Sequence, residues 1–239
     1  MTRYENSPLV EHTLQVIEAG RVPYTEALEW QRALAHARID GRLVHDVLLL
    51  VEHPPVVTLG RNAHAGHLLR RDGVDVFEIE RGGDITYHGP GQLVGYPILD
   101  LTRHKQDLHW YLRTLERAQI DALAELGIPA ERRPGYTGVW TRGRKIASIG
   151  VHVKQWVTWH GFALNVTTDL SQFERIVPCG IPGVEMTSVA RERGGALGEL
   201  WKQTVAAVIR GFGDAFDVTT TTSREDVARI RPASPFATR

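Results

Sequence analysis

Hydrophobic positions recur along this chain at two different spacings, which separate predicted helices from predicted strands. Between residues 108 and 126, apolar side chains fall three and four residues apart, so the pattern predicts an amphipathic helix with one buried face. Asp107 precedes it as an N-cap, and Gly127 ends it. Two further helices are predicted, over residues 26–40 and 197–216.

Short runs of β-branched and aliphatic residues, bounded by prolines and glycines, predict the strands. The clearest run is DVLLLVE, residues 46–52. Residues 139–142 and 145–154 flank Gly143-Arg144, which is expected to form a tight hairpin turn. Many strands in hairpin-like succession, with few long helices, predict an α+β fold with a mixed, largely antiparallel sheet and packed helices. The other predicted strands cover residues 14–18, 56–60, 76–80, 93–101 and 157–166.

The domain organisation is expected to be simple. No linker rich in glycine, serine and proline divides the sequence, so residues 1–218 are expected to form a single domain. Residues 219–239 begin with four threonines and continue as a polar stretch, which predicts a partly mobile C-terminal tail. The first 20 residues lack the apolar core of a secretory signal, and no run approaches the ~18 apolar residues that span a bilayer. A cytoplasmic protein is therefore expected.

Composition narrows the classes of function. The chain has 28 Lys+Arg and 28 Asp+Glu residues, and this balance argues against nucleic acid or a membrane surface as a partner. The single cysteine excludes an intrachain disulfide and a cysteine-rich zinc site. His64 and His67 form the one close histidine pair, with no carboxylate or thiol beside them at zinc spacing, so no metal or other cofactor is expected.

The single cysteine, Cys179, lies in a segment with an unusual backbone. Pro178 and Pro182 restrict this segment, whereas Gly180 and Gly183 let it turn sharply. A thiol on such a turn can be presented to a substrate. Most lone cysteines, however, are small buried hydrophobes. The segment alone therefore favours a core residue, and a nucleophile needs support from elsewhere in the chain.

A second unusual segment, residues 81–97, contains five glycines. It lacks the phosphate-loop pattern G-x-x-x-x-G-K-[ST], and Gly89, Gly91 and Gly95 miss the dinucleotide-binding spacing by one residue. The run LVGYPILDL predicts a strand, so no helix N-terminus is available to a phosphate. The segment does not indicate a nucleotide site, but its glycines let the backbone lie flat against a ligand.

The run RGGDITYHGPGQLVGYPILDL resembles the signature of the lipoyl(octanoyl) transferases: R-G-G, two residues, T, an aromatic residue, H, then G-x-G-Q and Y-P. Three further stretches match that family in the same order: GRKIASIGVHV, HGFALNV and IVPCGIPGVEMTSV. The resemblance runs from about residue 48 to residue 189. It implies the biotin/lipoate protein ligase-like fold and an acyltransferase that moves an octanoyl (or lipoyl) group, the first step of endogenous protein lipoylation.

The same resemblance implies a cysteine–lysine mechanism. Cys179 matches the nucleophile that carries the acyl group as a thioester, and Lys145 matches the residue that activates it. A nearby ammonium favours the thiolate, the reactive form of cysteine. Without the motif, Lys145 is expected to be a solvated lysine at a strand end. The implied walls of the acyl pocket are Arg81, Gly82, Gly83, Asp84 (a variable position), Ile85, Thr86, Tyr87, His88, Ser148, Ile149, Gly150, Gly161, Phe162 and Ala163.

Further roles follow from the chemistry of acyl transfer, and the partners come from the resemblance. Lys145, or His88 as a weaker candidate, is expected to take the proton of the incoming amine, while Ser148 and Gly150 are candidates to bind the thioester oxygen. The implied donor is octanoyl-acyl carrier protein. The implied acceptors are lipoyl-carrier domains of 2-oxoacid dehydrogenases and of the glycine cleavage protein, and the enzyme is expected to be a monomer. Candidates for a basic docking surface are Arg132, Arg133, Arg142 and Arg144.

Two alternatives remain open at this point. An ATP-dependent lipoate or biotin ligase of the same fold makes an acyl-adenylate and needs no cysteine. A non-catalytic acyl-binding protein would bind the chain without any covalent adduct.

Overall fold

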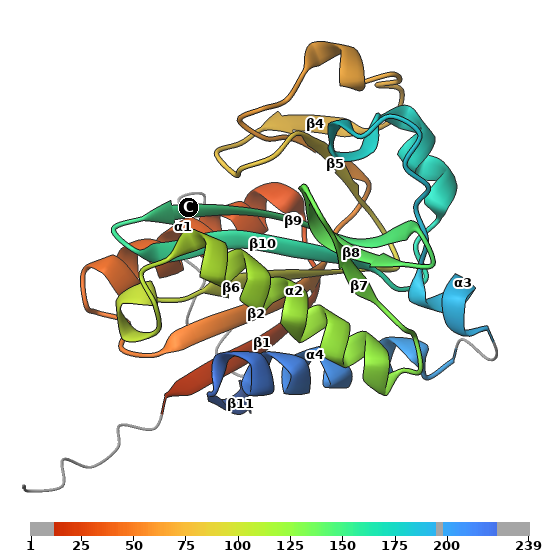
Figure 1. Ribbon diagram of the computed structural model, residues 1–239. Helices are drawn as coiled ribbons and strands as arrows, with labels where there is room; N and C mark the ends of the chain where they lie inside the picture. Colours follow the sequence, from red (N-terminus) through yellow and green to blue (C-terminus); the bar gives the residue numbers. More distant parts are fainter. Residues whose placement is uncertain (1–11, 195–197, 224–239) are drawn as a thin grey trace, which may run out of the picture.

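A mixed eight-stranded sheet forms the centre of the computed structural model, which describes residues 12–194 and 198–223 (Figure 1). β11 and β2 both run parallel to β1, and the other neighbouring pairs are antiparallel. The expected α+β fold with a mixed, largely antiparallel sheet is therefore confirmed. From one edge to the other, the strands are β11 (Thr219–Ser223), β1 (Thr13–Arg21), β2 (Asp46–Glu52), β6 (Gln92–Ile98), β10 (Val157–Asn165), β9 (Arg144–Lys154), β8 (Tyr136–Thr141) and β7 (Glu131–Arg133).

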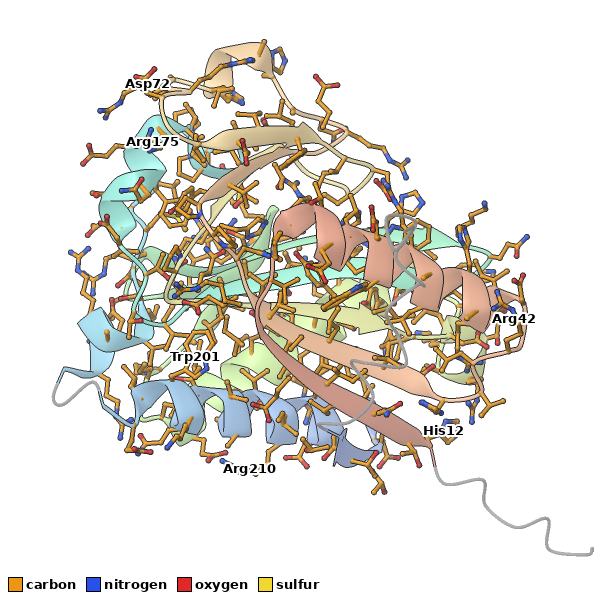
Figure 2. All side chains as sticks on the ribbon, turned by 180° about the vertical axis from the view of Figure 1, so that it is seen from behind. His12, Arg42, Asp72, Arg175, Trp201 and Arg210 are labelled. Carbon is orange, nitrogen blue, oxygen red and sulfur yellow. The ribbon has the colours of Figure 1, made fainter. Side chains whose placement is uncertain are left out.

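Helices cover both faces of this sheet. Alternate residues of β2 point to opposite faces, so Leu48 and Leu50 pack toward α2 (Leu108–Glu125) and α4 (Leu200–Phe216). Val47, Leu49 and Val51 pack on the other face, against α1 (Tyr24–Ile39). Both sides of β2 are thus buried, which explains its uninterrupted apolar sequence. Seen from behind, Arg210 lies on the outer side of α4, where it pairs with Glu125 at the end of α2 (Figure 2).

A second, three-stranded sheet brings the two unusual segments of the sequence together. It has the order β4 (Asp75–Glu78), β3 (Val56–Leu59) and β5 (Ile85–His88). The short 3₁₀ turns η3 (Leu170–Arg175) and η4 (Pro178–Gly180) pack against β5. The glycine-rich segment and the cysteine segment therefore meet at this sheet (Figure 1).

Several predicted boundaries need correction. The hairpin turn is Arg142-Gly143 rather than Gly143-Arg144, because residues 142 and 143 have φ of 49° and 78°, as a two-residue type I′ turn requires. The threonines at 219–222, expected to begin a tail, instead belong to β11, where β-branched side chains suit an edge strand. Residues 224–239 of the expected tail and position 197 of the last predicted helix lie outside the described residues. The short β7, β5 and α3 (Val189–Arg193) were not predicted.

Within the described ranges, no helix is both long enough and apolar enough to cross a membrane.

Candidate active site

Cys179 lies on a turn that presents its thiol. Its backbone is left-handed, with φ 56° and ψ 21°, and Gly180 follows with φ 67°. For a residue with a side chain this conformation costs on the order of 1 kcal/mol. The turn is held in place by the Val177 N–H, which donates to the His67 carbonyl at 2.8 Å. Cys179 is half-buried and lies at the edge of a cavity, so the interpretation as a core cysteine is wrong.

Lys145, near the start of β9, reaches the sulfur from the main sheet. Its Nζ donates to the Cys179 Sγ at 3.2 Å and to the Thr137 carbonyl at 3.3 Å, and it lies 4.8 Å from the Trp140 ring centroid. Lys145 is only 1 % exposed, so the expectation of a solvated lysine is wrong. No ion pair in the described part of the chain includes this amine. The thiolate is therefore the anion best placed to neutralise a buried ammonium here.

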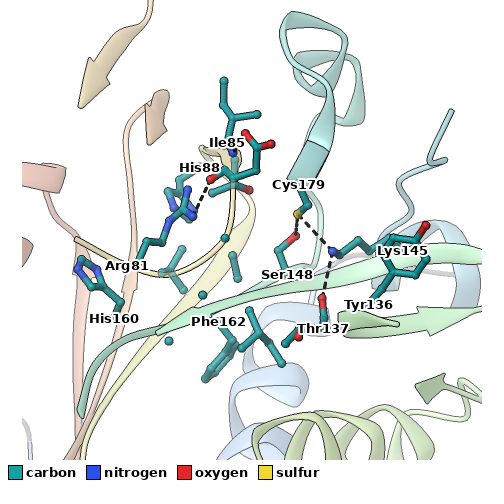
Figure 3. A pocket seen from close by; sticks show the side chains of 18 of the residues that line it. Arg81, Ile85, His88, Tyr136, Thr137, Lys145, Ser148, His160, Phe162 and Cys179 are labelled. Atoms are coloured by element: carbon teal, nitrogen blue, oxygen red, sulfur yellow. Dashed lines mark hydrogen bonds between the residues drawn. The ribbon is translucent and has the colours of Figure 1, made fainter. Parts of the chain in front are cut away.

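A cavity of about 200 Å³ opens beside this pair (Figure 3). Cys179, Lys145 and Ser148 lie at one side of it, and Arg81, His88 and His160 lie at the other. Apolar side chains of β6, β9 and β10 supply much of the surface between them, as an acyl chain requires. The expected wall residues that do line it are Arg81, Gly83, Asp84, Ile85, Thr86, His88, Ser148, Ile149, Gly150, Gly161, Phe162 and Ala163.

Gly82 and Tyr87 do not line this cavity, contrary to expectation. The Gly82 N–H donates to the Val151 carbonyl at 2.8 Å, which ties the glycine-rich segment to β9. Tyr87 points to the opposite side of β5 from its neighbours, because side chains alternate along a strand, and its ring packs against Phe173 at 5.6 Å. The resemblance identified the glycine-rich segment, and the alternation of side chains along β5 decides which of its residues face the cavity.

Sequence reasoning missed several residues of the cavity wall. Tyr96 and His160 lie inside the matched motifs, so those motifs were the available signal for them. Tyr24 belongs to α1, and Tyr136 follows the β7–β8 turn, where no sequence signal indicated a ligand. The complete set of missed residues is Tyr24, Val94, Tyr96, Gly135, Tyr136, Thr137, His160 and Ile181.

Arg81 holds the glycine-rich segment in its conformation. Its guanidinium donates to the carbonyls of Gly82, Asp84 and Thr58 at 3.0, 2.7 and 2.7 Å. Arg81 is 7 % exposed, and this burial lowers the pKa of its guanidinium, an effect that the nearby Cys179 opposes. A buried positive charge therefore lies on the same cavity as the thiol, where it favours the thiolate.

His88 is poorly suited to act as a base. Its Nδ1–H donates to the Gln92 Oε1 at 2.8 Å, because the amide oxygen can only accept. Burial, first, and then the neighbouring His53 lower the pKa of His88 to about 3. An imidazole that is neutral and this weakly basic takes up few protons near neutral pH. Of the two candidate bases, Lys145 is the better placed.

Asp84 lines the cavity and also supports the cysteine turn. Its Oδ2 accepts from the His67 Nδ1 at 2.6 Å, and its Oδ1 accepts from the Ile85 N–H at 2.7 Å. A Cβ added to Gly180 would lie 2.3 Å from that same Oδ2. The carboxylate therefore packs directly against the turn that carries Cys179.

The arginines considered for docking differ in their partners. Arg142 and Arg144 both pair with the carboxylate of Glu192, at 3.1 and 2.8 Å. Arg133 forms no ion pair with any described residue, and its guanidinium lies 5.2 Å over the ring of Tyr136, next to the cavity. Arg133 is thus the one most available to an acidic partner.

Across residues 12–194 and 198–223, no group of three or more histidine, cysteine, aspartate or glutamate side chains is arranged to hold a metal ion.

The sequence matches a known protein family and several named relatives. Residues 23–216 match the model of the lipoyl protein ligase A/B catalytic domain. An octanoyltransferase of Gloeobacter violaceus is 60% identical over 167 residues, 70% of this chain and 75% of the relative. An octanoyltransferase of a Nostoc species is 46% identical over 209 residues, 86% of this chain and 93% of the relative.

The fold has a close counterpart among solved structures. The crystal structure of lipoate-protein ligase A bound with ATP matches with a TM-score of 0.70 and covers 92% of both chains. Its sequence identity of 18% limits the likeness to the fold. The lipoate-ligase-like fold expected from the sequence is confirmed.

Proposed function

The chain belongs to the lipoyl protein ligase A/B catalytic domain family and is an octanoyltransferase, and on that premise we propose that Cys179 carries the octanoyl group as a thioester between two carrier proteins. The proposed donor is acyl carrier protein, and the proposed acceptor is a lysine of a lipoyl-carrier domain. The observation that supports this most strongly is the 3.2 Å contact between the Lys145 Nζ and the Cys179 Sγ beside a largely apolar cavity.

In the first half-reaction, the Cys179 thiolate attacks the thioester carbonyl of the octanoyl donor. A new C–S bond forms at Cys179, and the C–S bond to the carrier breaks. The Lys145 ammonium gives its proton to the departing carrier thiolate, which leaves a neutral amine beside the acyl-enzyme. Exchange of one thioester for another is nearly balanced in free energy, so the enzyme is not trapped at this stage.

In the second half-reaction, the acceptor lysine attacks the acyl-enzyme. An amine must lose a proton to become an amide, and the neutral Lys145 Nζ is placed to take it. The C–S bond at Cys179 breaks, the amide forms, and the thiolate–ammonium pair is restored. The Ser148 hydroxyl, with its Oγ 3.5 Å from the Cys179 Sγ, is the proposed donor to the carbonyl oxygen as it gains charge.

The test is a transfer assay without ATP. Purified protein, octanoyl-acyl carrier protein and a lipoyl-carrier domain are mixed, and octanoylation of the acceptor lysine is followed by mass spectrometry. Transfer is expected from the wild type, and the Cys179→Ser variant should lose it because an ester passes its acyl group to an amine more slowly. In a parallel assay that supplies free octanoate and ATP in place of the octanoyl donor, full activity of Cys179→Ser would instead indicate a ligase. Cytoplasmic location and a monomeric state belong to the same proposal, and cell fractionation and size-exclusion chromatography test them.

A further inference from the structure

A buried carboxylate lies just outside the cavity, on the far side of β8 from the thiol. Glu116, on α2, is 0 % exposed. Its Oε2 accepts from Arg113 at 2.7 Å and from Arg132 at 3.0 Å, and its Oε1 accepts from the Gly138 N–H at 3.1 Å. Burying a carboxylate is costly unless it is paired and hydrogen-bonded, and these three donors supply that pairing for Glu116.

The Gly138 N–H and the Thr137 carbonyl belong to the same peptide bond. A trans peptide is planar, so these two groups point in opposite directions. The N–H points to Glu116, while the carbonyl oxygen accepts from the Lys145 Nζ at 3.3 Å. A continuous chain of hydrogen bonds therefore runs from Glu116 through one peptide to Lys145, and from Lys145 to the Cys179 sulfur at 3.2 Å.

The local structure of β8 leaves the Thr137–Gly138 peptide free to form these two hydrogen bonds. Neither Thr137 nor Gly138 has a partner in the register with β7 or with β9, both of which are fully described. Gly138 has φ 136°, and a Cβ there would lie 2.9 Å from the Lys145 Cε. That Cβ would lie closer still, at 2.7 Å, to the Ala147 carbonyl oxygen of β9, so glycine lets both the β9 backbone and the lysine side chain approach the strand.

We infer that Glu116 is a positioning residue for the Cys179–Lys145 pair and acts on the Lys145 ammonium through the Thr137–Gly138 peptide. The negative charge polarises the peptide, so its carbonyl becomes a stronger acceptor for the ammonium. A protonated Lys145 in turn favours the Cys179 thiolate. This inference rests on the proposed roles of Cys179 and Lys145, and it adds Glu116 as a more distant residue that supports them.

Glu192 provides a matched control. It too is a shielded carboxylate, with a side chain 1 % exposed, and it too is shared by two arginines, Arg142 and Arg144. It also accepts from the Thr187 hydroxyl. Unlike Glu116, it has no hydrogen bond to the Thr137–Gly138 peptide. Replacing glutamate by glutamine at either position removes one negative charge that two arginines share.

The experiment measures the pH dependence of Cys179 alkylation by iodoacetamide in the free enzyme, together with the thermal midpoint. Glu116→Gln keeps an amide oxygen for the Gly138 N–H but loses the charge. Its alkylation midpoint is expected to rise by about half a pH unit or more, roughly a threefold loss of thiolate at a fixed pH. Glu192→Gln is expected to lower the thermal midpoint and leave the alkylation midpoint where it is. An unchanged profile for Glu116→Gln, or an equal shift for Glu192→Gln, would overturn the inference.

Two further variants keep the test decisive if Glu116→Gln folds poorly. Arg132→Gln removes a cation that is itself 41 % exposed, so the Glu116 charge acts more strongly and the alkylation midpoint should fall. A rise, or no change, contradicts the inference. In a Lys145→Ala background, the effect of Glu116→Gln should vanish, which a purely structural role does not predict.

Alkylation needs no carrier protein, so failure of this inference leaves the proposed octanoyl transfer untouched. Absence of transfer by the wild type would refute the proposed function instead.

Discussion

The ring of Phe162 lies directly across Gly95, so closely that a Cβ at position 95 would be 2.2 Å from two of its ring carbons. The two residues are register partners in neighbouring strands, β10 and β6. The ring is backed by Phe212 of α4, with 5.4 Å between centroids, while Phe162 also lines the cavity. The absence of a side chain at Gly95 therefore lets the Phe162 ring lie close against β6, which leaves room in the cavity for an acyl chain.

Gly95→Ala should shorten the space for the acyl chain. The added methyl group displaces the Phe162 ring, and Phe212 blocks its retreat, so the ring moves toward the cavity. Each buried CH₂ of an acyl chain contributes about 0.8 kcal/mol, so a donor that can no longer bury its last carbons loses roughly tenfold in rate. Single-turnover acylation with octanoyl and hexanoyl donors measures this. We expect the octanoyl rate to fall more than the hexanoyl rate, and an equal loss for both would contradict the assignment of this wall.

Lys145→Ala and Lys145→Arg should separate the two uses of the lysine. Alanine removes the cation, so alkylation of Cys179 should shift to higher pH and acylation should slow. Arginine keeps a positive charge but does not release a proton. It should therefore preserve the reactivity of the thiolate toward iodoacetamide, slow acylation because it cannot protonate the departing carrier thiolate, and fail in transfer to the acceptor amine. Iodoacetamide profiles and single-turnover rates for each half-reaction distinguish these effects. If the alanine variant alkylated with the wild-type profile, Lys145 would have no role in activating the thiol.

Gly180→Ala should damage the cysteine turn more than Gly183→Ala does. Both glycines have left-handed backbones, with φ of 67° and 71°, so alanine is strained at either. Only at position 180 would the new Cβ also meet the Asp84 carboxylate, at 2.3 Å. Acylation should therefore fall by at least about tenfold in Gly180→Ala, with a smaller loss in Gly183→Ala. Comparable rates in the two variants would show that the Asp84 contact does not hold the nucleophile.

His53 should make the protein less stable as the pH falls below neutral. The buried ring donates its Nδ1–H to the Val22 carbonyl at 2.7 Å, and its Nε2 accepts from the Tyr96 hydroxyl at 2.7 Å. Burial lowers the pKa of His53 from 6.5 to about 4. Between these two values the unfolded chain binds a proton that the folded chain does not, so the free energy of unfolding should fall by about 1.4 kcal/mol per pH unit from this group.

Urea unfolding of the wild type and of His53→Gln, from neutral pH down to about pH 5, checks this contribution. His88, whose pKa burial lowers to about 3, adds a loss of the same sign in both proteins. The variant should therefore keep part of the pH dependence and show a smaller slope than the wild type. Identical slopes would contradict the burial of a neutral His53.

The main sheet and its large helices could be predicted because their hydrophobic periods are long and regular. Asp107, for example, caps α2 as expected, with its side chain accepting from the Trp110 N–H at 3.0 Å. In the small sheet, β3 and β4 were predicted but β5 was missed, because Ile85–His88 lies in a glycine-rich segment and becomes a strand only through pairing with β3. Such pairing is a tertiary effect that local propensity does not report.

At the site, the motifs located the segments that form the cavity, but not which side chains of each segment face it. Tyr87 illustrates this, because it belongs to a matched motif and yet points away from the cavity. Tyr24 illustrates the opposite case, because α1 folds back across the sheet and delivers it from outside every motif. The burial of Lys145 and its link to Glu116 depend on an irregular stretch of β8, and no residue pattern indicates that irregularity.

The most direct measurement is the intact mass of the protein after a single turnover with octanoyl-acyl carrier protein and no acceptor. We predict a gain of one octanoyl group on the peptide that contains Cys179, its absence in Cys179→Ala, and its discharge when a lipoyl-carrier domain is added. A protein that octanoylates the acceptor at the normal rate without ever acquiring this mass, or that carries it on another residue, would contradict the account.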